Sequence, residues 1–402
     1  MRYDVLILGA GPAGLTASYH AAAAGKRVLT LDKASRPGTK LLLAGGGKGN
    51  VTNRHVESTD YVGEYPSFAE YALERVTPDV VCQELKEARI SLEEREYGRI
   101  FCTVSAHRLL DLLLTRLPRD RCTVRTGSQV KKIHHTDGVF HIDCGVETWS
   151  APQLIMSTGS PAWPQSGADD SGLRLVSAFG HRVIPPRPVL VPLVMPPDWQ
   201  LAGLSGISIP VRIACAVPGS PKIKDSLLFT HKGISGPAVL QISCWWRKNA
   251  ALTIDFLPDE NAETVLDNAI GKATPLSIFS RRLPERLCLA LLDPALADRR
   301  AAELSRRQRA AIADALHRHT VTPSRGEGLG KAEAAAGGVD VAGINPLTME
   351  SHRVHGLFFC GEIMDVTGRL GGYNLHWAWA SGTVAGEAVA EYGKSERKRS
   401  IT

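Results

Sequence analysis

The first thirty residues alternate between short apolar runs and small or turn-forming residues. Residues 5–8 are all apolar, as expected of a strand that is buried on both faces. Residues 12 to about 24 predict an alanine-rich helix that ends at Gly25, and residues 27–31 predict a second buried strand. Strand, helix and strand in this order predict a βαβ unit with a parallel sheet.

Three glycines lie between the first strand and the helix. Gly9, Gly11 and Gly14 form G-x-G-x-x-G: the first allows a tight turn, the second lets the backbone approach a pyrophosphate, and the third lets helix and strand pack closely. Asp32 follows the second strand at the spacing expected for a carboxylate on a ribose hydroxyl, and its charge disfavours a 2′-phosphate. In this context the glycines predict a dinucleotide site rather than a simple glycine-rich turn.

Two further segments have the composition of backbone that approaches a ligand. Residues 39–53, TKLLLAGGGKGNVTN, combine consecutive glycines with short polar side chains, although a flexible surface loop is the alternative. Residues 154–156 predict a strand that leads into the small residues 157–160, where the backbone can again approach a cofactor. Val130 lies where a strand can pass an adenine.

The middle of the chain changes character. Residues 70–90 and 104–117 have helical periodicity, and residues 122–149 alternate as short strands. From about residue 185 the prolines of PPRPVLVPLVMPP exclude a central strand or a helix. Short β-like runs up to about residue 257 then predict a small β-rich substrate domain, and residues 262–319 are helical.

The helical segment is rich in arginine. Nine arginines and five acidic residues lie between positions 281 and 318, and the chain as a whole carries a net charge of +6. A solvated helix face is one interpretation, and a lid that holds an anionic or nucleic-acid substrate is the other. The arginines are Arg281, Arg282, Arg286, Arg299, Arg300, Arg306, Arg307, Arg309 and Arg318.

Cysteine spacing and hydropathy exclude several kinds of protein. The eight cysteines are scattered without a C-x-x-C pair, which argues against a metal site or a redox disulfide and predicts a reducing cytoplasm. No apolar stretch is long enough to span a bilayer, so no membrane association is expected. A second G-x-G-x-x-G does not occur, so a nicotinamide donor would bind transiently rather than in a domain of its own.

The motifs together resemble those of bacterial NAD(P)/FAD-dependent oxidoreductases of the BaiN/YhiN type, the aminoacetone-oxidase-like FAD-binding flavoproteins. The resemblance covers nearly the whole chain. It is carried by GAGPAG (9–14), GTKLLLAGGGKGNVTN (38–53), YGRIFC (97–102), STGSPAWPQSGADDSG (157–172), LLFTHKGISGPAVLQIS (227–243), KAEAAAGGV (331–339), TMES (348–351) and GEIMDVTGRLGGYNLHWAWASGTVAG (361–386).

The resemblance implies an α/β fold: a Rossmann-like FAD domain of the glutathione-reductase type, with an inserted β-barrel-like domain and a small inserted helical domain. We expect residues 1–188 and 335–402 to form the discontinuous FAD domain. Residues 189–258 and 320–334 would form the β-rich domain, and residues 259–319 the basic helical insertion.

The resemblance also assigns residues to non-covalently bound FAD. The residues expected to bind it, including those named above, are Gly9, Gly11, Pro12, Ala13, Gly14, Asp32, Lys33, Lys40, Gly46, Gly47, Asn50, Thr52, Val130, Thr158, Gly159, Gly361, Glu362, Asp365, Gly372, Tyr373, Asn374 and Leu375. Three segments depart from the family pattern. Ala44, Lys48 and Gly49 replace the serine, arginine and cysteine of SGGGRCNVTN, the usual AEVTAGGV is AEAAAGGV, and the usual GRVFP is GRIFC. Chemistry that depends on a thiol at the first of these segments is therefore not expected here.

The implied reaction is the NAD(P)H-driven reduction of an activated C=C bond, in an enone-like or uracil-like substrate, by hydride transfer from flavin N5. Protonation of the neighbouring carbon needs an acid. Tyr373 and His231 are the candidates, while His376 is expected to be a helix residue. Two alternatives stay open: an oxidase or dehydrogenase of a small amine or alcohol, and an RNA-associated flavoprotein that binds through its basic helices. Oligomeric state is not predicted.

Overall fold

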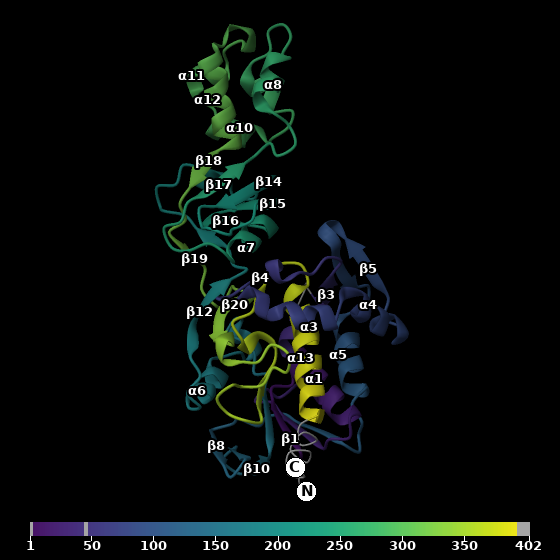
Figure 1. Ribbon diagram of the computed structural model, residues 1–402. Coiled ribbons are helices and arrows are strands. Elements are labelled where there is room, and N and C mark those ends of the chain that lie inside the picture. Colours follow the sequence, from purple (N-terminus) through teal and green to yellow (C-terminus); the bar gives the residue numbers. More distant parts are fainter. Residues whose placement is uncertain (1–2, 44–46, 392–402) are drawn as a thin grey trace. The chain divides into compact units, whose positions relative to one another are not determined.

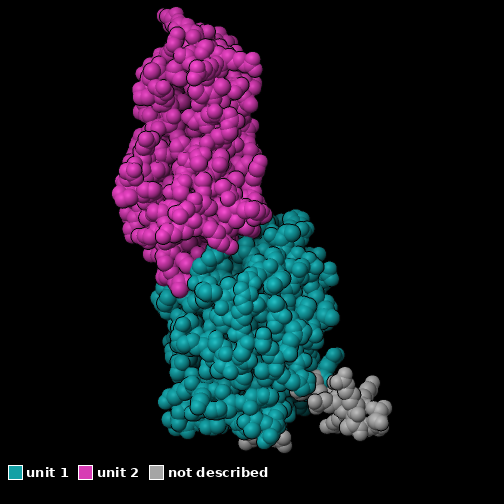
Figure 2. All heavy atoms as spheres, turned by 60° about the vertical axis from the view of Figure 1, so that its left-hand side comes forward, with its two compact units in different colours: residues 1–187, 334–402 teal, residues 188–333 magenta. Residues whose placement is uncertain are grey.

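The chain forms two compact units (Figures 1 and 2), seen in a computed structural model that describes residues 3–43 and 47–391. Unit 1 comprises residues 1–187 and 334–402, and unit 2 comprises residues 188–333. Unit 1 is thus built from both ends of the sequence, with unit 2 inserted between them. A further division of unit 2 into β-rich and helical domains stays a prediction.

A five-stranded parallel sheet forms the centre of unit 1. Its strand order is β21-β11-β1-β2-β7, and β1 pairs in register with β2 on one side and β11 on the other. The strands are β1 (Val5–Leu8), β2 (Val28–Leu31), β7 (Cys122–Arg125), β11 (Gln153–Met156) and β21 (Leu357–Phe359). Every residue of β1 and β2 is buried, as continuous apolar runs require. The predicted Rossmann-like α/β fold is confirmed.

The first and last helices of unit 1 pack side by side (Figure 1). Helix α1 (Pro12–Ala23) follows the glycine turn, and α13 (Tyr373–Glu391) is almost entirely buried. Gly382 and Gly386 make the contact possible, because a Cβ on either would lie 2.6 Å from a carbonyl oxygen of α1. The ends of the sequence therefore meet through small residues spaced one helical turn apart.

The remaining elements of unit 1 surround this core. Smaller sheets have the strand orders β10-β9-β8, β3-β6-β5, β12-β20 and β22-β4. Their strands are β3 (Asn50–Asn53), β4 (Tyr61–Val62), β5 (Leu92–Arg95), β6 (Arg99–Cys102), β8 (Lys132–Thr136), β9 (Val139–Asp143), β10 (Thr148–Ala151), β12 (Val183–Val189), β20 (Ala334–Val339) and β22 (Thr367–Gly368). The helices are α2 (Thr39–Leu43), α3 (Glu70–Arg75), α4 (Pro78–Glu87), α5 (Ala106–Thr115) and α6 (Ser171–Ser177).

The helical pattern at residues 70–90 is divided between α3 and α4. The Thr77 side chain accepts a hydrogen bond from the Val80 N–H, and Pro78 occupies the first position of α4. A capping residue followed by proline starts a new helix. Thr77 and Pro78 therefore signalled the boundary between the two helices, although the apolar periodicity continues through residues 70–90.

Unit 2 is built on a seven-stranded sheet with a core of its own. The strand order is β18-β17-β14-β15-β16-β13-β19. The strands are β13 (Leu193–Val194), β14 (Ser208–Cys215), β15 (Ile223–Thr230), β16 (Gly233–Ser235), β17 (Leu252–Asp255), β18 (His319–Val321) and β19 (Arg325–Gly326). The helices are α7 (Pro237–Ile242), α8 (Ala262–Asp267), α9 (Pro275–Phe279), α10 (Glu285–Leu291), α11 (Pro294–Ala297) and α12 (Arg306–His317).

The proline-rich segment around residue 185 leads from the sequence of unit 1 into that of unit 2. Strand β12 pairs with β20 in a two-stranded sheet, which fits a segment whose prolines cannot donate ladder hydrogen bonds. One residue beyond β12, the Leu190 carbonyl accepts a hydrogen bond of 3.2 Å from the N–H of Glu333. The chain therefore leaves and re-enters unit 1 at neighbouring points.

Candidate functional site

The glycines of the β1–α1 turn differ in whether packing within the protein requires a residue without a side chain. Gly9 has a φ of +106°, and a Cβ there would lie 2.3 Å from the carbonyl oxygen of Ser157. A Cβ on Gly14 would lie 2.0 Å from the carbonyl oxygen of Gly9. Internal packing therefore requires glycine at both positions.

Gly11 has no such internal reason to be glycine. Its φ of −78° suits any residue, and beyond its own chain neighbours no atom of the described residues lies within 4 Å of the position of its missing Cβ. It precedes α1, whose first N–H groups face the same turn. An open space beside a helix N-terminus is what a bound pyrophosphate needs, so the turn fits the dinucleotide expected from the sequence.

Asp32 is held beside this turn by backbone groups. Its carboxylate accepts N–H hydrogen bonds from Ala10 at 2.6 Å and from Ala34 at 2.8 Å. The N–H of Ser128 donates to the Asp32 carbonyl at 2.8 Å, which places the segment leading to Val130 next to Asp32. Val130, two residues beyond Ser128, is partly buried against the core.

Two predicted lysines are paired with carboxylates. Lys33 lies 2.6 Å from Asp169, and Lys40 lies 2.5 Å from Glu362. Glu362 also accepts a hydrogen bond of 2.9 Å from the Ser160 hydroxyl. The Lys40–Glu362–Ser160 cluster joins three segments that are far apart in the sequence, and Glu362 belongs to the C-terminal block.

The segment after α2 packs on the glycines that precede α13. With its amide oxygen facing Gly372, Asn50 accepts the Gly372 N–H at 3.0 Å, and the Asn53 amide donates to the Gly371 carbonyl at 3.1 Å. Gly372 has a φ of +98°, and a Cβ there would lie 2.3 Å from the Thr52 carbonyl oxygen. The predicted loop and the predicted C-terminal turn therefore form one structure. Gly46 and Ala44 lie outside the described residues, Gly47 has a φ of +85°, and Lys48 is exposed.

His376 is buried behind this turn. Its Nδ1 lies 2.7 Å from the Thr52 hydroxyl, and burial lowers its pKa to about 4. The ring is therefore neutral at physiological pH, as befits the helix residue expected from the sequence.

Tyr373 is packed inside unit 1. Its exposed fraction is 2%, its hydroxyl accepts a hydrogen bond of 2.9 Å from Arg369, and burial raises its pKa to about 12. Arg369 also pairs with Asp60 at 2.6 Å, and the Tyr61 hydroxyl donates to the Tyr373 carbonyl at 3.0 Å. These contacts of Tyr373 hold the start of α13 in place.

The other predicted residues of the C-terminal block hold the same segment together. Asp365 is buried and accepts N–H bonds from Glu64 and Gly337, and burial raises its pKa. The Asn374 amide exchanges two hydrogen bonds of 2.8 Å with the backbone of Gly368. Leu375 packs against the core.

Two small-residue turns follow β11 and β21. Thr158 and Gly159 come directly after β11, and Gly159 has a φ of +76° with open space where a Cβ would be, as far as the described residues show. Gly361 also has a φ of +76°, and its N–H donates to the Ser381 hydroxyl at 2.9 Å. Both turns lie at the carboxyl ends of parallel strands, where ligands bind in open α/β sheets.

His231 belongs to unit 2. It is exposed in the turn between β15 and β16, while Tyr373 belongs to unit 1. The two candidate acids thus lie in different units.

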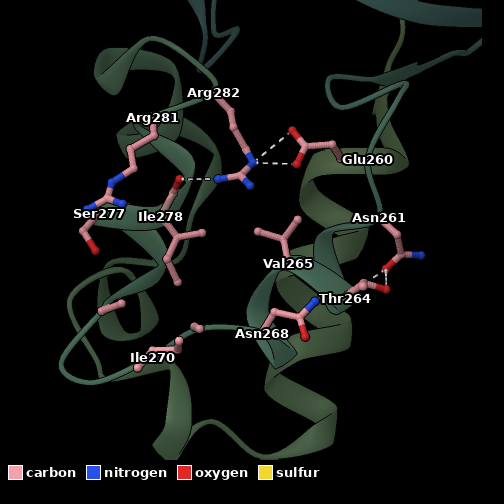
Figure 3. Close-up of a pocket in the computed structure, with 12 residues that line it drawn as sticks. Glu260, Asn261, Thr264, Val265, Asn268, Ile270, Ser277, Ile278, Arg281 and Arg282 are labelled. Carbon is pink, nitrogen blue, oxygen red and sulfur yellow. Dashed lines mark hydrogen bonds and ion pairs between the residues drawn. The ribbon is translucent and has the colours of Figure 1, made fainter.

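A cavity of about 660 Å³ lies wholly within unit 2, between α8 and α9 (Figure 3). Val265 and Ile278 line its apolar part, and at one end Arg282 forms hydrogen bonds to both carboxylate oxygens of Glu260 (Figure 3). None of the residues expected to bind FAD lines it.

Several arginines of the helical segment have their charge neutralised by an ion pair. Arg282, Arg300, Arg309 and Arg318 each pair with a carboxylate of the same segment. Arg306 and Arg307 are exposed and have no ion pair with any described residue. Arg281, Arg286 and Arg299 are likewise exposed and have no ion pair with any described residue, so the basic character left for a partner is spread along the segment, with Arg306 and Arg307 adjacent in the first turn of α12.

Several residues that shape the site were not among those expected to bind FAD. Ser157 donates its hydroxyl to the carbonyls of Leu8 and Gly9, and Asn53 and Asp60 position the C-terminal turn. The small polar residues of NVTN and STGS were the sequence signal that could have identified them. Their partners can be distant, however: Asn53 and Gly371 are 318 residues apart. No group of three or more metal-ligating side chains occurs in residues 3–43 and 47–391, and no helix there has the length and apolarity needed to cross a bilayer.

Comparison with known proteins places these observations in context. Residues 3–388 match the family described as HI0933-like protein Rossmann domain. The Escherichia coli (strain K12) protein named ribosomal RNA dihydrouridine synthase is 36% identical over 386 residues, which cover 94% of this chain and 96% of that protein. The Clostridium scindens protein named 3-dehydro-bile acid delta(4,6)-reductase is 30% identical over 404 residues, covering 96% and 98%.

Solved structures show the same architecture. The 3-ketosteroid-delta4-(5alpha)-dehydrogenase from Rhodococcus jostii RHA1 superimposes with a TM-score of 0.51 at 14% identity, and the alignment covers 97% of each chain. At this identity the likeness shows the fold alone.

Proposed function

Because the chain belongs to the HI0933-like family of Rossmann-domain, FAD-dependent oxidoreductases, we propose that it reduces a carbon–carbon double bond conjugated to a carbonyl group. The family resemblance carried by the sequence motifs is confirmed by this membership, as are FAD as the cofactor and oxidoreductase as the class of enzyme. Substrate, electron donor and the roles of individual residues belong to the proposal.

The names of two relatives support reduction of a double bond. One names dihydrouridine as a product, and the other names a Δ4,6-reductase. Uracil and a steroid enone share a C=C bond next to a carbonyl, which is the electron-poor alkene that accepts hydride. The relative named for RNA is the more similar of the two, at 36% against 30% identity. We therefore propose a uridine in ribosomal RNA as the first substrate to test.

Open space at Gly11, within a turn otherwise dictated by packing, is the observation that carries the assignment of the cofactor site. The N–H groups at the start of α1 would bind the pyrophosphate, and Asp32 would accept from a ribose hydroxyl. The Lys40–Glu362–Ser160 cluster and the Gly371–Gly372 turn would hold the ribityl and ring portions. FAD, once reduced, would supply the hydride, and NAD(P)H is the proposed donor that would reduce it.

A proton must also reach the carbon next to the one that accepts hydride. Tyr373 is buried with a pKa of about 12, so it gives up its proton only with difficulty. His231 is exposed and could act only where the substrate meets unit 2. Loss of the donor should lower turnover by roughly 10²- to 10⁴-fold without changing the FAD content, so Tyr373→Phe and His231→Asn assayed in parallel separate the two.

The first experiment is an anaerobic titration of the purified yellow protein with NADH and with NADPH, followed by flavin absorbance. Bleaching by either nucleotide is expected, and addition of a uridine-containing ribosomal RNA fragment or of 4-androstene-3,17-dione should restore the colour. Mass spectrometry of the product should then show the gain of two hydrogen atoms.

Two results would contradict the proposal. Bleached enzyme that neither acceptor reoxidises is not a reductase of this class of alkene. An enzyme whose flavin is reduced by neither NADH nor NADPH, but which consumes oxygen in the presence of a small amine or alcohol, is an oxidase. That is the alternative left open by the sequence.

A further inference from the structure

The backbone at Tyr97 has an uncommon conformation. Tyr97 lies at the tip of the β5–β6 hairpin with a φ of +61° and a ψ of +28°, the left-handed region that residues other than glycine seldom adopt. Its side chain is nevertheless 53% exposed. A strained residue with an exposed aromatic ring directs attention to function, because burial of the ring does not compensate for the strain.

The hairpin tip is fastened to the turn that precedes α13. The side-chain amide of Asn53 donates two hydrogen bonds of 3.1 Å, one to the Tyr97 carbonyl and one to the Gly371 carbonyl. A Cβ on Gly98 would lie 2.8 Å from the Asn53 side-chain oxygen, so the chain beside Tyr97 is also closely packed. One amide therefore fixes Tyr97 relative to the Gly371–Gly372 turn.

Arg99 supports the ring from one side. Its guanidinium carbon lies 5.3 Å from the centroid of the Tyr97 ring, and its Cγ would lie 3.5 Å from a Cβ placed on Gly371. An arginine over one face of a tyrosine restricts the ring while leaving its remaining surface accessible. A rigid, half-exposed aromatic ring of this kind suits the stacking of a flat ligand.

We propose that Tyr97 is a substrate-binding residue on which the planar, conjugated ring of the substrate stacks beside the Gly371–Gly372 turn. The inference rests on the proposed function and names the class of ligand for the same site: a flat ring with a C=C bond next to a carbonyl. A pyrimidine base in RNA and a steroid enone share this chemistry, and the test includes both.

The positive φ provides a substitution that removes the ring without straining the fold. Glycine adopts a φ of +61° freely, so Tyr97→Gly should fold and melt like the wild-type protein or slightly better. Tyr97→Phe keeps the ring and removes the hydroxyl. Tyr71→Ala serves as the matched control, because Tyr71 is another exposed tyrosine of unit 1, in α3.

Binding is measured on the oxidised holoenzyme without an electron donor, from the change in flavin absorbance on titration. The probes are a uridine-containing oligonucleotide and 4-androstene-3,17-dione. Stacking on an aromatic ring is worth enough that Tyr97→Gly should weaken binding of the preferred probe by roughly five-fold to more than a hundred-fold. Tyr97→Phe should stay within about two-fold of wild type, and Tyr71→Ala should be unchanged.

The outcomes separate the inference from the proposed function. Wild-type enzyme that binds neither probe contradicts the proposed function, and the inference with it. Wild-type enzyme that binds a probe, together with Tyr97→Gly that binds it equally well, overturns the inference alone. A Tyr97→Gly protein that loses FAD or melts at a lower temperature would assign Tyr97 a structural role and would likewise overturn the inference.

Discussion

Single residues of the glycine turn separate what folding requires from what the cofactor requires. Gly9 and Gly14 are glycine because carbonyl oxygens occupy the positions of their side chains, whereas Gly11 faces open space. The three positions belong to one sequence pattern, but only Gly11 depends on something other than the described protein to explain it.

Substitution of Gly11 and Gly14 tests this separation. Gly11→Ala should leave the apoprotein within about 1 kcal/mol of wild type, since only the N-cap of α1 changes, while FAD affinity falls because the methyl group enters the pyrophosphate space. Gly14→Ala should destabilise the apoprotein by about 1–3 kcal/mol, because its Cβ would meet the Gly9 carbonyl. Thermal melts of both apoproteins and the ratio of FAD to protein provide the measurement. Gly11→Ala with wild-type FAD affinity would contradict the assignment.

Buried histidines predict how stability depends on pH. Burial lowers the pKa of His20, His181 and His376 to about 4 each, against an ordinary value of 6.5. Between these values the unfolded chain binds protons that the folded chain does not. The stabilisation that each neutral ring contributes is therefore complete above about pH 6.5 and is lost as the pH falls toward 4.

Replacement of His376 should make this dependence shallower. His376→Gln removes one of the three groups, so melting temperature should fall less steeply between pH 6.5 and 4 than it does in the wild-type protein. His352→Gln changes an exposed histidine and serves as the control. Equal slopes in the wild-type protein and His376→Gln would show that His376 does not carry this dependence.

At the scale of elements, α12 has charges that its own stability does not explain. Ser305 and Gln308 form a capping box at its start, yet Arg306 and Arg307 occupy the first turn, where the helix dipole disfavours cations. Arg309 differs from both, because it pairs with Asp267 and donates to the Leu304 and Ala301 carbonyls. An anionic partner such as RNA would account for the first two arginines but is not needed for the third.

Neutralisation of this pair tests the contact with RNA. Arg306→Gln combined with Arg307→Gln should weaken binding of the RNA fragment and reduce the slope of log K against log salt by roughly 1.5, with no loss of thermal stability. Arg318→Glu changes the net charge equally but replaces an arginine that pairs with Asp314, and it should leave the slope unchanged. A double variant with the wild-type slope would exclude the start of α12 as the RNA contact.

At the scale of the whole molecule, unit 2 is an insertion whose two ends are adjacent. Strands β12 and β20 pair with each other, and the hydrogen bond between Glu333 and Leu190 joins the chain on either side of the insertion. Each unit has its own apolar core. Unit 1 therefore contains the elements that an independently folding FAD domain needs.

Removal of unit 2 tests this independence. A chain in which a short Gly-Ser linker replaces residues 190–333 should fold and retain FAD, because the linker needs to span only neighbouring strand ends. Circular dichroism and the ratio of FAD to protein provide the readouts. The shortened chain should not reduce substrate if unit 2 supplies the proton or holds the acceptor. Flavin-free or insoluble protein would show instead that unit 1 depends on unit 2.

Local features were predictable from the sequence because their causes lie within a few residues. The buried runs at residues 5–8 and 28–31, the glycine turn and the Gly25 helix end follow from burial, periodicity and backbone freedom alone. The family resemblance made the fold and the cofactor predictable as well. The long C-terminal block of motifs forms the turn and helix that the resemblance implies.

Long-range contacts were decided only by the tertiary structure. Lys40 meets Glu362, Asn50 and Asn53 meet the Gly371–Gly372 turn, and Tyr97 is carried to the same turn, across separations of up to 322 residues. The type of a short polar side chain indicates which hydrogen bonds it can form, but not which distant segment provides the partner. That choice depends on how the sheet and the α1–α13 packing bring both ends of the chain together, and it was settled by burial of the whole core rather than by any local pattern.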